Sequence, residues 1–242
     1  MREKDTLYAS PLAEIADFKF DQAVASVFAD MINRSVPGYG LVVDQIGVLA
    51  RHYALPDSRL YDLGCSLGAA TLSMRHRVET AGCEIIAIDN APAMIDRCQE
   101  YLDKDSASLP VQTLCQDIRD VSISNASVVV MNYTLQFIAP LEREALMRTI
   151  YDGLLPGGVL ILAEKVMESS STQEALFQSL HTDFKRAQGY SDIEISQKRS
   201  SLENVLVSES LPTHQQRLQT AGFSQSAVWF HCYNFAALLA IK

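Results

Sequence analysis

No apolar run in this sequence approaches the ~20 residues that a membrane-spanning helix needs. The opening stretch, MREKDTLYAS, is charged and lacks the apolar core of a secretory signal peptide. These two absences predict a cytoplasmic protein that has no membrane partner.

Cysteine pairs and histidine clusters are also missing. The five cysteines form no CxxC pair, and the five histidines show neither HExxH nor HxxxH spacing. An odd number of scattered thiols argues against a disulfide framework and against a zinc site. We therefore expect no metal, and reduced, mostly buried thiols at Cys65, Cys83, Cys98, Cys115 and Cys232.

Positive charge is scarce, with 20 Lys and Arg against 29 Asp and Glu and a formal net charge of −9. A protein that grips nucleic acid usually needs a basic face that neutralises phosphates. We therefore expect no direct nucleic-acid binding. An acidic protein can still hold a local cationic pocket, so an anionic small substrate remains open.

The sequence does contain a regular alternation of short apolar segments with amphipathic ones. This alternation predicts an α/β fold with a largely parallel sheet. The expected strands cover 59–63, 84–89, 111–116, 127–132 and 159–164, with a closing pair at 226–230 and 235–242. The expected helices between them cover 70–78, 93–104, 140–154 and 213–220.

Two regions stand outside this rhythm. Before the first strand, helical spacing of apolar residues predicts helices at 21–35 and 41–53, and residues 1–20 are expected to form a mobile arm. A polar, helical stretch at about 165–210 is expected to cap a site. We therefore divide the chain into an N-terminal helical arm and cap, 1–54, and an α/β domain, 55–242, with an insertion.

The most informative motif is Tyr61-Asp62-Leu63-Gly64-Cys65-Ser66-Leu67-Gly68, where the first strand runs into a helix. Glycine lets the backbone turn sharply and approach a ligand closely. The free N–H groups at the start of the following helix favour a carboxylate or a phosphate. Taken alone, the motif is also compatible with a tight turn that binds nothing.

Polar residues follow three more of the expected strands. Asp89 ends the second strand, where an acid can accept both hydroxyls of a ribose. Asp117, with Ile118 beside it, follows the third strand and suits an adenine amino group and ring, and Asn132 ends the fourth. The carboxyl ends of parallel strands share one edge, where open α/β sheets bind ligands. This register predicts a nucleoside site rather than isolated surface charges.

With these pieces and its LLPGG turn, the chain resembles the class I S-adenosyl-methionine (SAM)-dependent methyltransferases over roughly 55–165 and 220–242. The resemblance implies a Rossmann-like fold whose seven-stranded, mostly parallel sheet carries helices on both faces and a helical cap. Ser66 departs from the glycine that is common at its position. A GxGxxG nicotinamide site fits less well, because the glycine spacing and Asp117 favour SAM.

A closer resemblance is to the carboxy-SAM synthases. It rests on the DLGCS turn, on Asp89-Asn90 and on four further segments, FKFD (18–21), RSVPGY (34–39), NYTLQF (132–137) and Lys198-Arg199. It implies that SAM and prephenate give carboxy-SAM and phenylpyruvate, and that a downstream enzyme uses the product to modify the tRNA wobble uridine. It also implies a homodimer in which Arg199 reaches the site of the partner subunit.

The resemblance further implies a role for each site residue. Tyr39 and Arg199 are implied as catalytic, Tyr39 near the carboxy-sulfonium end and Arg199 on the added carboxylate. Without the resemblance, Lys198-Arg199 reads as a solvated helix face. The remaining implied ligand contacts are Gly64, Cys65 and Ser66 along the methionine, Asp89 and Asn90 at the ribose and adjoining adenine, Asp117 and Ile118 at the adenine, and Asn132 near the ligand's centre.

Two other functions remain open from the sequence. One is an ordinary small-molecule methyltransferase, in which Tyr39 and Arg199 only orient a substrate. The other is a non-catalytic SAM-binding subunit of a tRNA-modifying complex. Analysis of the product separates the first from a carboxy-SAM synthase, and turnover by the purified protein eliminates the second.

Overall fold

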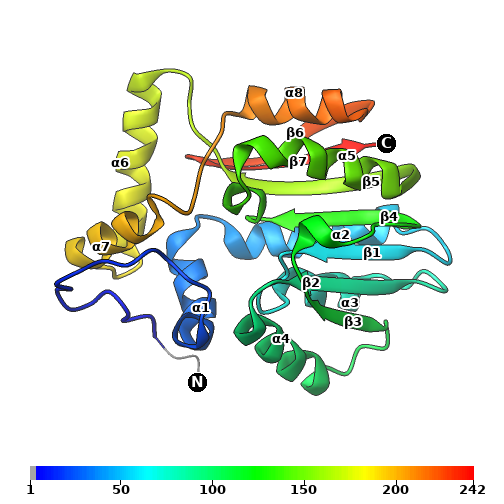
Figure 1. Cartoon of the computed structure of the whole chain (residues 1–242), viewed down its shortest axis with the longest axis horizontal. Coiled ribbons are helices and arrows are strands. Elements are labelled where there is room, and N and C mark those ends of the chain that lie inside the picture. Colours follow the sequence, from blue (N-terminus) through cyan, green and yellow to red (C-terminus); the bar gives the residue numbers. More distant parts are fainter. Residues whose placement is uncertain (1–3) are drawn as a thin grey trace.

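The computed structural model describes residues 4–242, and these form one seven-stranded sheet in the order β3-β2-β1-β4-β5-β7-β6 (Figure 1). Neighbouring strands from β3 to β5 are parallel, whereas β7 runs antiparallel to both β5 and β6. The predicted fold class is therefore confirmed. The strands are β1 Arg59–Leu63, β2 Glu84–Asp89, β3 Val111–Cys115, β4 Ala126–Asn132, β5 Leu154–Lys165, β6 Gln225–Cys232 and β7 Phe235–Ile241.

Helices cover both faces of the sheet because side chains alternate along each strand. Ile85 of β2 packs with the cluster under α2 and α3, whereas its neighbour Ile86 packs with the cluster under α5 and α8. No helix within residues 4–242 is both long and apolar enough to cross a membrane. The covering helices are α2 Tyr39–Tyr53, α3 Ala69–Arg77 and α4 Pro92–Lys104 on one face, and α5 Arg143–Gly153 and α8 Leu211–Ala221 on the other (Figure 1).

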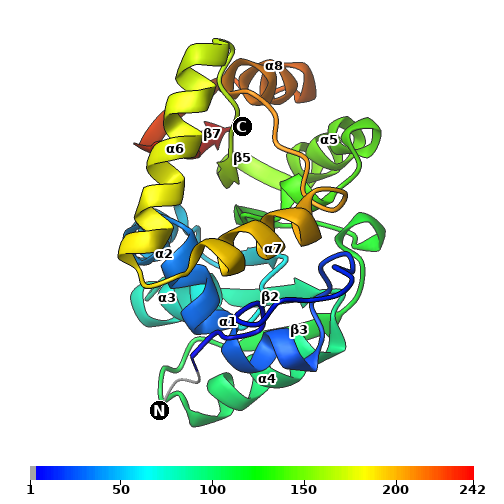
Figure 2. The ribbon, with the colours of Figure 1, turned by 90° about the vertical axis from the view of Figure 1, so that its left-hand side faces the viewer.

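The predicted insertion folds as two helices, α6 Ser171–Ala187 and α7 Asp192–Leu202. Together with α1 Gln22–Ser35 they stand beyond the carboxyl ends of the strands, as Figure 2 shows. The start of α7 is fixed by a capping box in which Ser191 and Glu194 satisfy each other's backbone N–H groups. These three helices form what we call the cap.

The expectation of a mobile N-terminal arm is wrong for residues 4–20. Asp5 is buried, its backbone N–H donates to Asp30 Oδ2 (2.8 Å), and its carboxylate accepts from Tyr190. Gln197 of α7 donates to the carbonyl oxygens of Tyr8 and Ser10 (2.9 Å each). Asp5 could not be recognised from the sequence as a buried acid, because its partners Asp30 and Tyr190 lie far away in the chain. Residues 1–3 lie outside the described residues.

Smaller differences concern the helix before β5 and the thiols. The expected helix at 140–154 starts with a 3₁₀ turn, η3 Pro140–Glu142, and ends at Gly153. The LLPGG segment then belongs to β5 rather than to a turn that closes the helix. All five thiols are free, and Cys65, Cys83 and Cys98 are buried as expected, whereas Cys115 is exposed and Cys232 is half-buried.

Candidate functional site

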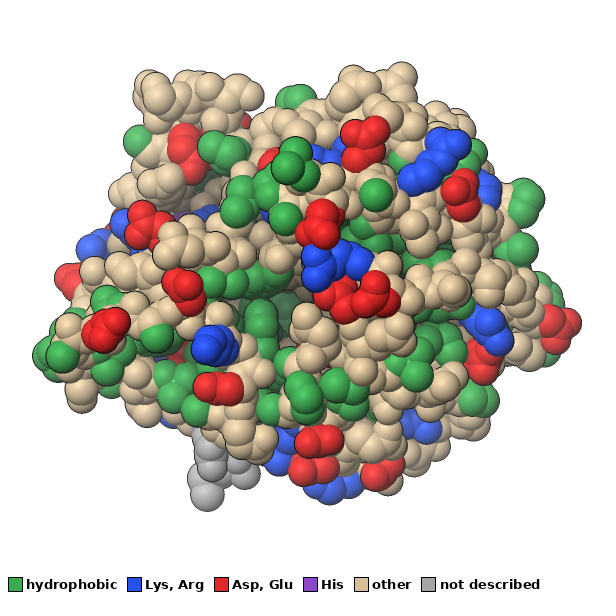
Figure 3. Space-filling view, viewed as in Figure 1, with side chains coloured by type: hydrophobic (Ala, Val, Ile, Leu, Met, Phe, Trp, Pro, Cys, Tyr) green, Lys and Arg blue, Asp and Glu red, His purple; other side chains and the backbone are tan. Residues whose placement is uncertain are grey.

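A cavity of about 600 Å³ lies between the cap and the carboxyl edge of the sheet. On the face shown in Figure 3, a hollow lined by hydrophobic side chains opens between these two parts. Every site residue predicted from the sequence lines this cavity, so the structure brings the whole set together. The residues are Tyr39, Gly64, Cys65, Ser66, Asp89, Asn90, Asp117, Ile118, Asn132 and Arg199.

The turn after β1 is built for close approach of backbone to ligand. Gly64 has φ 79°, and a Cβ at this position would overlap the side chain of Thr134. Ser66 has φ 51°, the left-handed conformation that glycine adopts most easily. The departure from glycine at position 66 is therefore accommodated without a change in the path of the turn. Gly68 caps α3 without a side-chain hydrogen bond, which leaves the first N–H groups of this helix available.

Asp89 connects this turn to the next strand. Its Oδ2 accepts from the backbone N–H of Ser66 (2.9 Å) and its Oδ1 accepts from that of Ala91 (2.9 Å). Burial raises the pKa of Asp89, and these two hydrogen bonds oppose that shift. Each carboxylate oxygen has a second lone pair. Asp89 can therefore shape the turn and still accept ribose hydroxyls.

Asp117 is held by Arg119, which also lines the cavity. Arg119 Nε donates to Asp117 Oδ1 (2.9 Å), Nη2 donates to Oδ2 (2.6 Å), and Nη1 reaches Glu142 (2.7 Å). The guanidinium lowers the pKa of Asp117 and keeps it an ionised acceptor. Ile118 is buried beside it and offers an apolar contact.

Unpaired polar atoms face the middle of the cavity. Asn132 Oδ1 is buried and has no hydrogen-bond partner among residues 4–242. Thr71 donates to Asp62 Oδ2 (2.6 Å), but Asp62 Oδ1 also has no partner in this part of the chain. Burial raises the pKa of Asp62 to about 6 and also raises that of Tyr39. Asp62 was not among the predicted site residues, although it precedes Gly64 in the same motif.

Cations line the side of the cavity formed by the cap and the end of β5. Lys185 is only 9% exposed, and burial together with Lys165, Lys198 and Arg199 lowers its pKa to about 7. Burial also lowers the pKa of His181 to about 3, so this imidazole is neutral and donates to Ser35 O (2.8 Å). Sequence spacing missed Lys165, His181 and Lys185 as a group, because two separate elements, β5 and α6, carry the cluster.

The cavity is therefore polarised. Asp62, Asp89 and Asp117 come from the ends of β1, β2 and β3, with Arg119 paired to Asp117, whereas Lys165, Lys185, Lys198 and Arg199 come from the end of β5 and from the cap. Such a site suits a ligand with hydroxyl and cationic groups at one end and an anion at the other. Within residues 4–242, no group of three His, Cys, Asp or Glu side chains lies close enough together to hold a metal ion.

Comparison with known proteins identifies the family. Residues 60–158 match a family model described as a methyltransferase domain. A protein of Trichlorobacter lovleyi named carboxy-S-adenosyl-L-methionine synthase is 59% identical over 242 residues, which is 100% of this chain and 99% of that protein. A protein of the same name from Shewanella pealeana is 55% identical over 239 residues, 99% of this chain and 98% of that protein.

The chain belongs to the carboxy-S-adenosyl-L-methionine synthases. It is thus an enzyme of a SAM-binding superfamily, and the resemblance stated from its sequence is confirmed.

Solved structures of low sequence identity support the fold. Human N-acetylserotonin methyltransferase in complex with SAM superposes with a TM-score of 0.62 at 17% identity, over 91% of this chain and 55% of that one. A putative SAM-dependent methyltransferase of Methanococcus maripaludis gives 0.60 at 18% identity, over 96% of this chain and 97% of that one. The carboxy-SAM synthase chain therefore has the class I methyltransferase fold.

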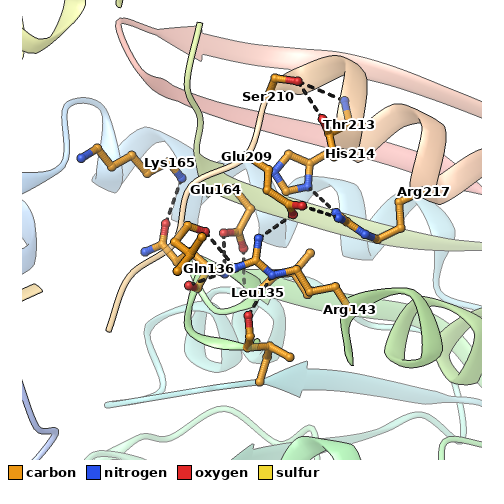
Figure 4. A network of polar contacts seen from close by, with 12 residues as sticks. Leu135, Gln136, Arg143, Glu164, Lys165, Glu209, Ser210, Thr213, His214 and Arg217 are labelled. Atoms are coloured by element: carbon orange, nitrogen blue, oxygen red, sulfur yellow. Dashed lines mark hydrogen bonds and ion pairs between the residues drawn. The ribbon is translucent and has the colours of Figure 1, made fainter. Parts of the chain in front are cut away.

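A buried polar network fixes one wall of the synthase cavity (Figure 4). Glu164 accepts the backbone N–H groups of Leu135 (2.8 Å) and Gln136 (2.9 Å), and Gln136 Oε1 accepts the backbone N–H of Lys165 (3.0 Å). Arg143, fully buried, donates to Gln136 O (3.3 Å) and pairs with Glu209. The network holds the segment after β4 against β5. Asn132 precedes this segment at the end of β4, and Lys165 lies at the end of β5.

Proposed function

We propose that this carboxy-SAM synthase converts SAM and prephenate to carboxy-SAM and phenylpyruvate. The observation that carries the proposal is the polarised cavity, with Asp89 and Asp117 at the sheet edge and buried cations facing them from the cap. The carboxylates suit the adenosine and the ammonium of SAM. The cations suit prephenate, which brings two carboxylates.

The chemistry needs both ends of this cavity at once. Loss of carbon dioxide and hydroxide from prephenate leaves phenylpyruvate. A proton leaves the SAM methyl group, whose C–H is acidified by the adjacent sulfonium, and combines with the hydroxide to give water. The resulting ylide carbon forms a bond to carbon dioxide and gives carboxy-SAM. A carbanion of this kind needs a site that excludes water, and the aromatic rings of the half-buried Tyr39 and the buried Tyr133, 6.2 Å apart, favour one.

We assign the ligand contacts as the resemblance implies. Gly64, Cys65 and Ser66 lie along the methionine, Asp89 and Asn90 hold the ribose and adjoining adenine, and Asp117 and Ile118 hold the adenine. Asn132 lies near the ligand's centre, and Tyr39 lies near the carboxy-sulfonium end. Arg199 binds the added carboxylate through the two prongs of its guanidinium. No resident metal takes part in this scheme.

We further propose a cytoplasmic homodimer in which Arg199 serves the partner's site. Each subunit then consists of an N-terminal helical arm and cap, 1–54, and a SAM-binding domain, 55–242, that carries the helical insertion. In this chain Arg199 is exposed and its Nη2 lies 3.3 Å from Thr182 Oγ1, so no acid holds it in place. The product serves a downstream tRNA-modifying enzyme. On the face shown in Figure 3, Lys and Arg lie interspersed with Asp and Glu, which supports weak or no direct tRNA binding.

The test is to incubate the purified chain with SAM and prephenate whose ring carboxylate carries ¹³C. We expect phenylpyruvate, and a product with the mass of SAM plus labelled carbon dioxide. S-adenosylhomocysteine together with a methylated acceptor would instead indicate an ordinary methyltransferase. The absence of any turnover by the purified chain would reject the proposal in favour of a non-catalytic SAM-binding subunit.

A further inference from the structure

Two lysines of the cavity wall, the buried Lys185 and the half-buried Lys165, lack the partners that cations in such places normally have. Lys198 donates to Ser35 Oγ (2.9 Å) and lies 3.9 Å from Asp5. By contrast, neither Lys165 nor Lys185 makes a side-chain hydrogen bond or an ion pair within residues 4–242, although both line the cavity. Burying an ammonium group without a partner costs free energy. An anion from outside the chain is the partner that the wall lacks.

The two lysines come from different elements that meet at one place. Lys165 ends β5, and its side chain in Figure 4 extends away from the polar network that holds its backbone. Lys185 lies in the last turn of α6. They are close enough for Lys165 to lower the pKa of Lys185. Glu174, the acid that favours the charged form of Lys165, already accepts from Glu168 N (2.7 Å) and Gln178 (2.7 Å).

An amide and a flat apolar surface lie beside the lysines. Asn234 lines the cavity and is 1% exposed, and neither its Oδ1 nor its Nδ2 has a hydrogen-bond partner in the described chain. Phe235, which pairs with Lys165 across β5 and β7, packs its ring 4.9 Å from that of His181 and 6.0 Å from that of Tyr133. The place therefore offers two cations, an amide and an aromatic face.

We propose that Lys165 and Lys185 form the subsite for the carboxylate of the donor that is not transferred, the 2-oxo acid end that remains in the product, with Asn234 hydrogen-bonded to this end. The inference rests on the proposed function, which gives the other carboxylate to Arg199. Two cationic positions then select a donor with two carboxylates. A monocarboxylate that lacks the 2-oxo acid end leaves the ammonium groups of Lys165 and Lys185 unpaired.

Phenylpyruvate provides the sharpest probe, because it keeps the 2-oxo acid end and has lost the transferred carboxylate. Calorimetric titration of phenylpyruvate into the SAM-loaded protein needs no turnover. We expect Lys185→Met and Lys165→Met each to raise its Kd by roughly tenfold to a hundredfold. Arg199→Ala should leave this Kd nearly unchanged while it abolishes carboxyl transfer. Lys104→Met, an exposed lysine at the end of α4, is the matched control and should change nothing.

Different outcomes distinguish a failure of the proposed function from a failure of the lysine subsite alone. A wild-type protein that neither binds phenylpyruvate nor turns over prephenate defeats the proposed function and this inference with it. Normal turnover, with an unchanged phenylpyruvate Kd in both lysine variants, defeats the inference alone. A loss of phenylpyruvate binding in Arg199→Ala as large as in Lys185→Met also overturns it. Urea unfolding of each variant, together with SAM affinity, establishes that the pocket is intact, and Lys185→Arg should restore part of the binding.

Discussion

Replacement of Asp89 by alanine tests the nucleoside end of the cavity. In the proposed complex the ionised carboxylate accepts two ribose hydroxyls, and charge-assisted hydrogen bonds contribute ~1.5–3 kcal/mol each. Since 1.4 kcal/mol is about tenfold in affinity, the Kd for SAM should rise at least about a hundredfold. The same oxygens also accept from Ser66 N and Ala91 N. Leaving these two N–H groups without an acceptor should lower the free energy of unfolding by ~2–4 kcal/mol.

Two measurements are needed because the substitution acts in two ways. Isothermal titration gives the SAM affinity, and urea unfolding of the unliganded protein gives the stability. Asp89→Asn keeps one carbonyl acceptor and should lie between wild type and Asp89→Ala in both. Asp96→Ala removes an exposed carboxylate from α4 and should change neither. An Asp89→Ala protein that binds SAM with wild-type affinity would refute the assignment of this acid to the ribose.

Further predictions concern the turn, the pH dependence, the dimer and tRNA. Gly64→Ala should destabilise the fold by ~2–4 kcal/mol in urea unfolding, from the left-handed φ and the collision with Thr134, and wild-type stability would contradict this. SAM affinity should be level above about pH 6 and weaken below it. Burial raises the pKa of Asp62 to about 6, and a protonated Asp62 no longer attracts the cationic groups of the ligand. A SAM affinity that stays constant from about pH 8 to about pH 5 would exclude this role. Refolded mixtures of Arg199→Ala and Asp89→Ala subunits should regain phenylpyruvate formation that neither variant shows alone, and confirmed heterodimers without recovery would end the shared-site hypothesis. Gel-shift assays should show weak tRNA binding at most, whereas tight, salt-sensitive binding would contradict the charge argument.

The fold was predictable because its signals are local. Strands β2 and β4 are short, mostly apolar runs, and Ile85 and Ile86 show how both faces of such a strand are buried. Helices between strands repeat apolar residues at helical spacing. The meeting of Asp89 and Asp117 in one cavity was predictable for a topological reason, since parallel strands bring both acids to one edge whatever the helices between them contain. The predictions that were wrong or missing concern segments outside this alternation of strands and helices.

Those errors share a physical cause, which is pairing between residues that are distant in the sequence. The charged composition of residues 1–20 indicated an arm in solvent, yet Asp5 is buried against Tyr190. Lys165 and Lys185 resemble solvated surface lysines in the sequence, because nothing local distinguishes an ammonium that faces water from one that faces a cavity. Asp5 and Lys185 are placed by α6, α7 and the connection between these helices, whose positions depend on tertiary packing, whereas Lys165 lies at the end of β5.

The sheet edge and the cap differ in how far the fold itself provides partners for their charged groups. Two of the acids at the sheet edge have partners within the fold, Ser66 and Ala91 for Asp89 and Arg119 for Asp117, whereas Asp62 Oδ1 has none among residues 4–242. In the cap, Lys185 is buried without a hydrogen-bonded or ion-paired partner among residues 4–242, and such a group lowers the free energy of unfolding until an anion joins it. A ligand that binds only the folded state stabilises it. In the proposed complex, a carboxylate of the donor therefore offsets the cost of burying Lys185 without a partner.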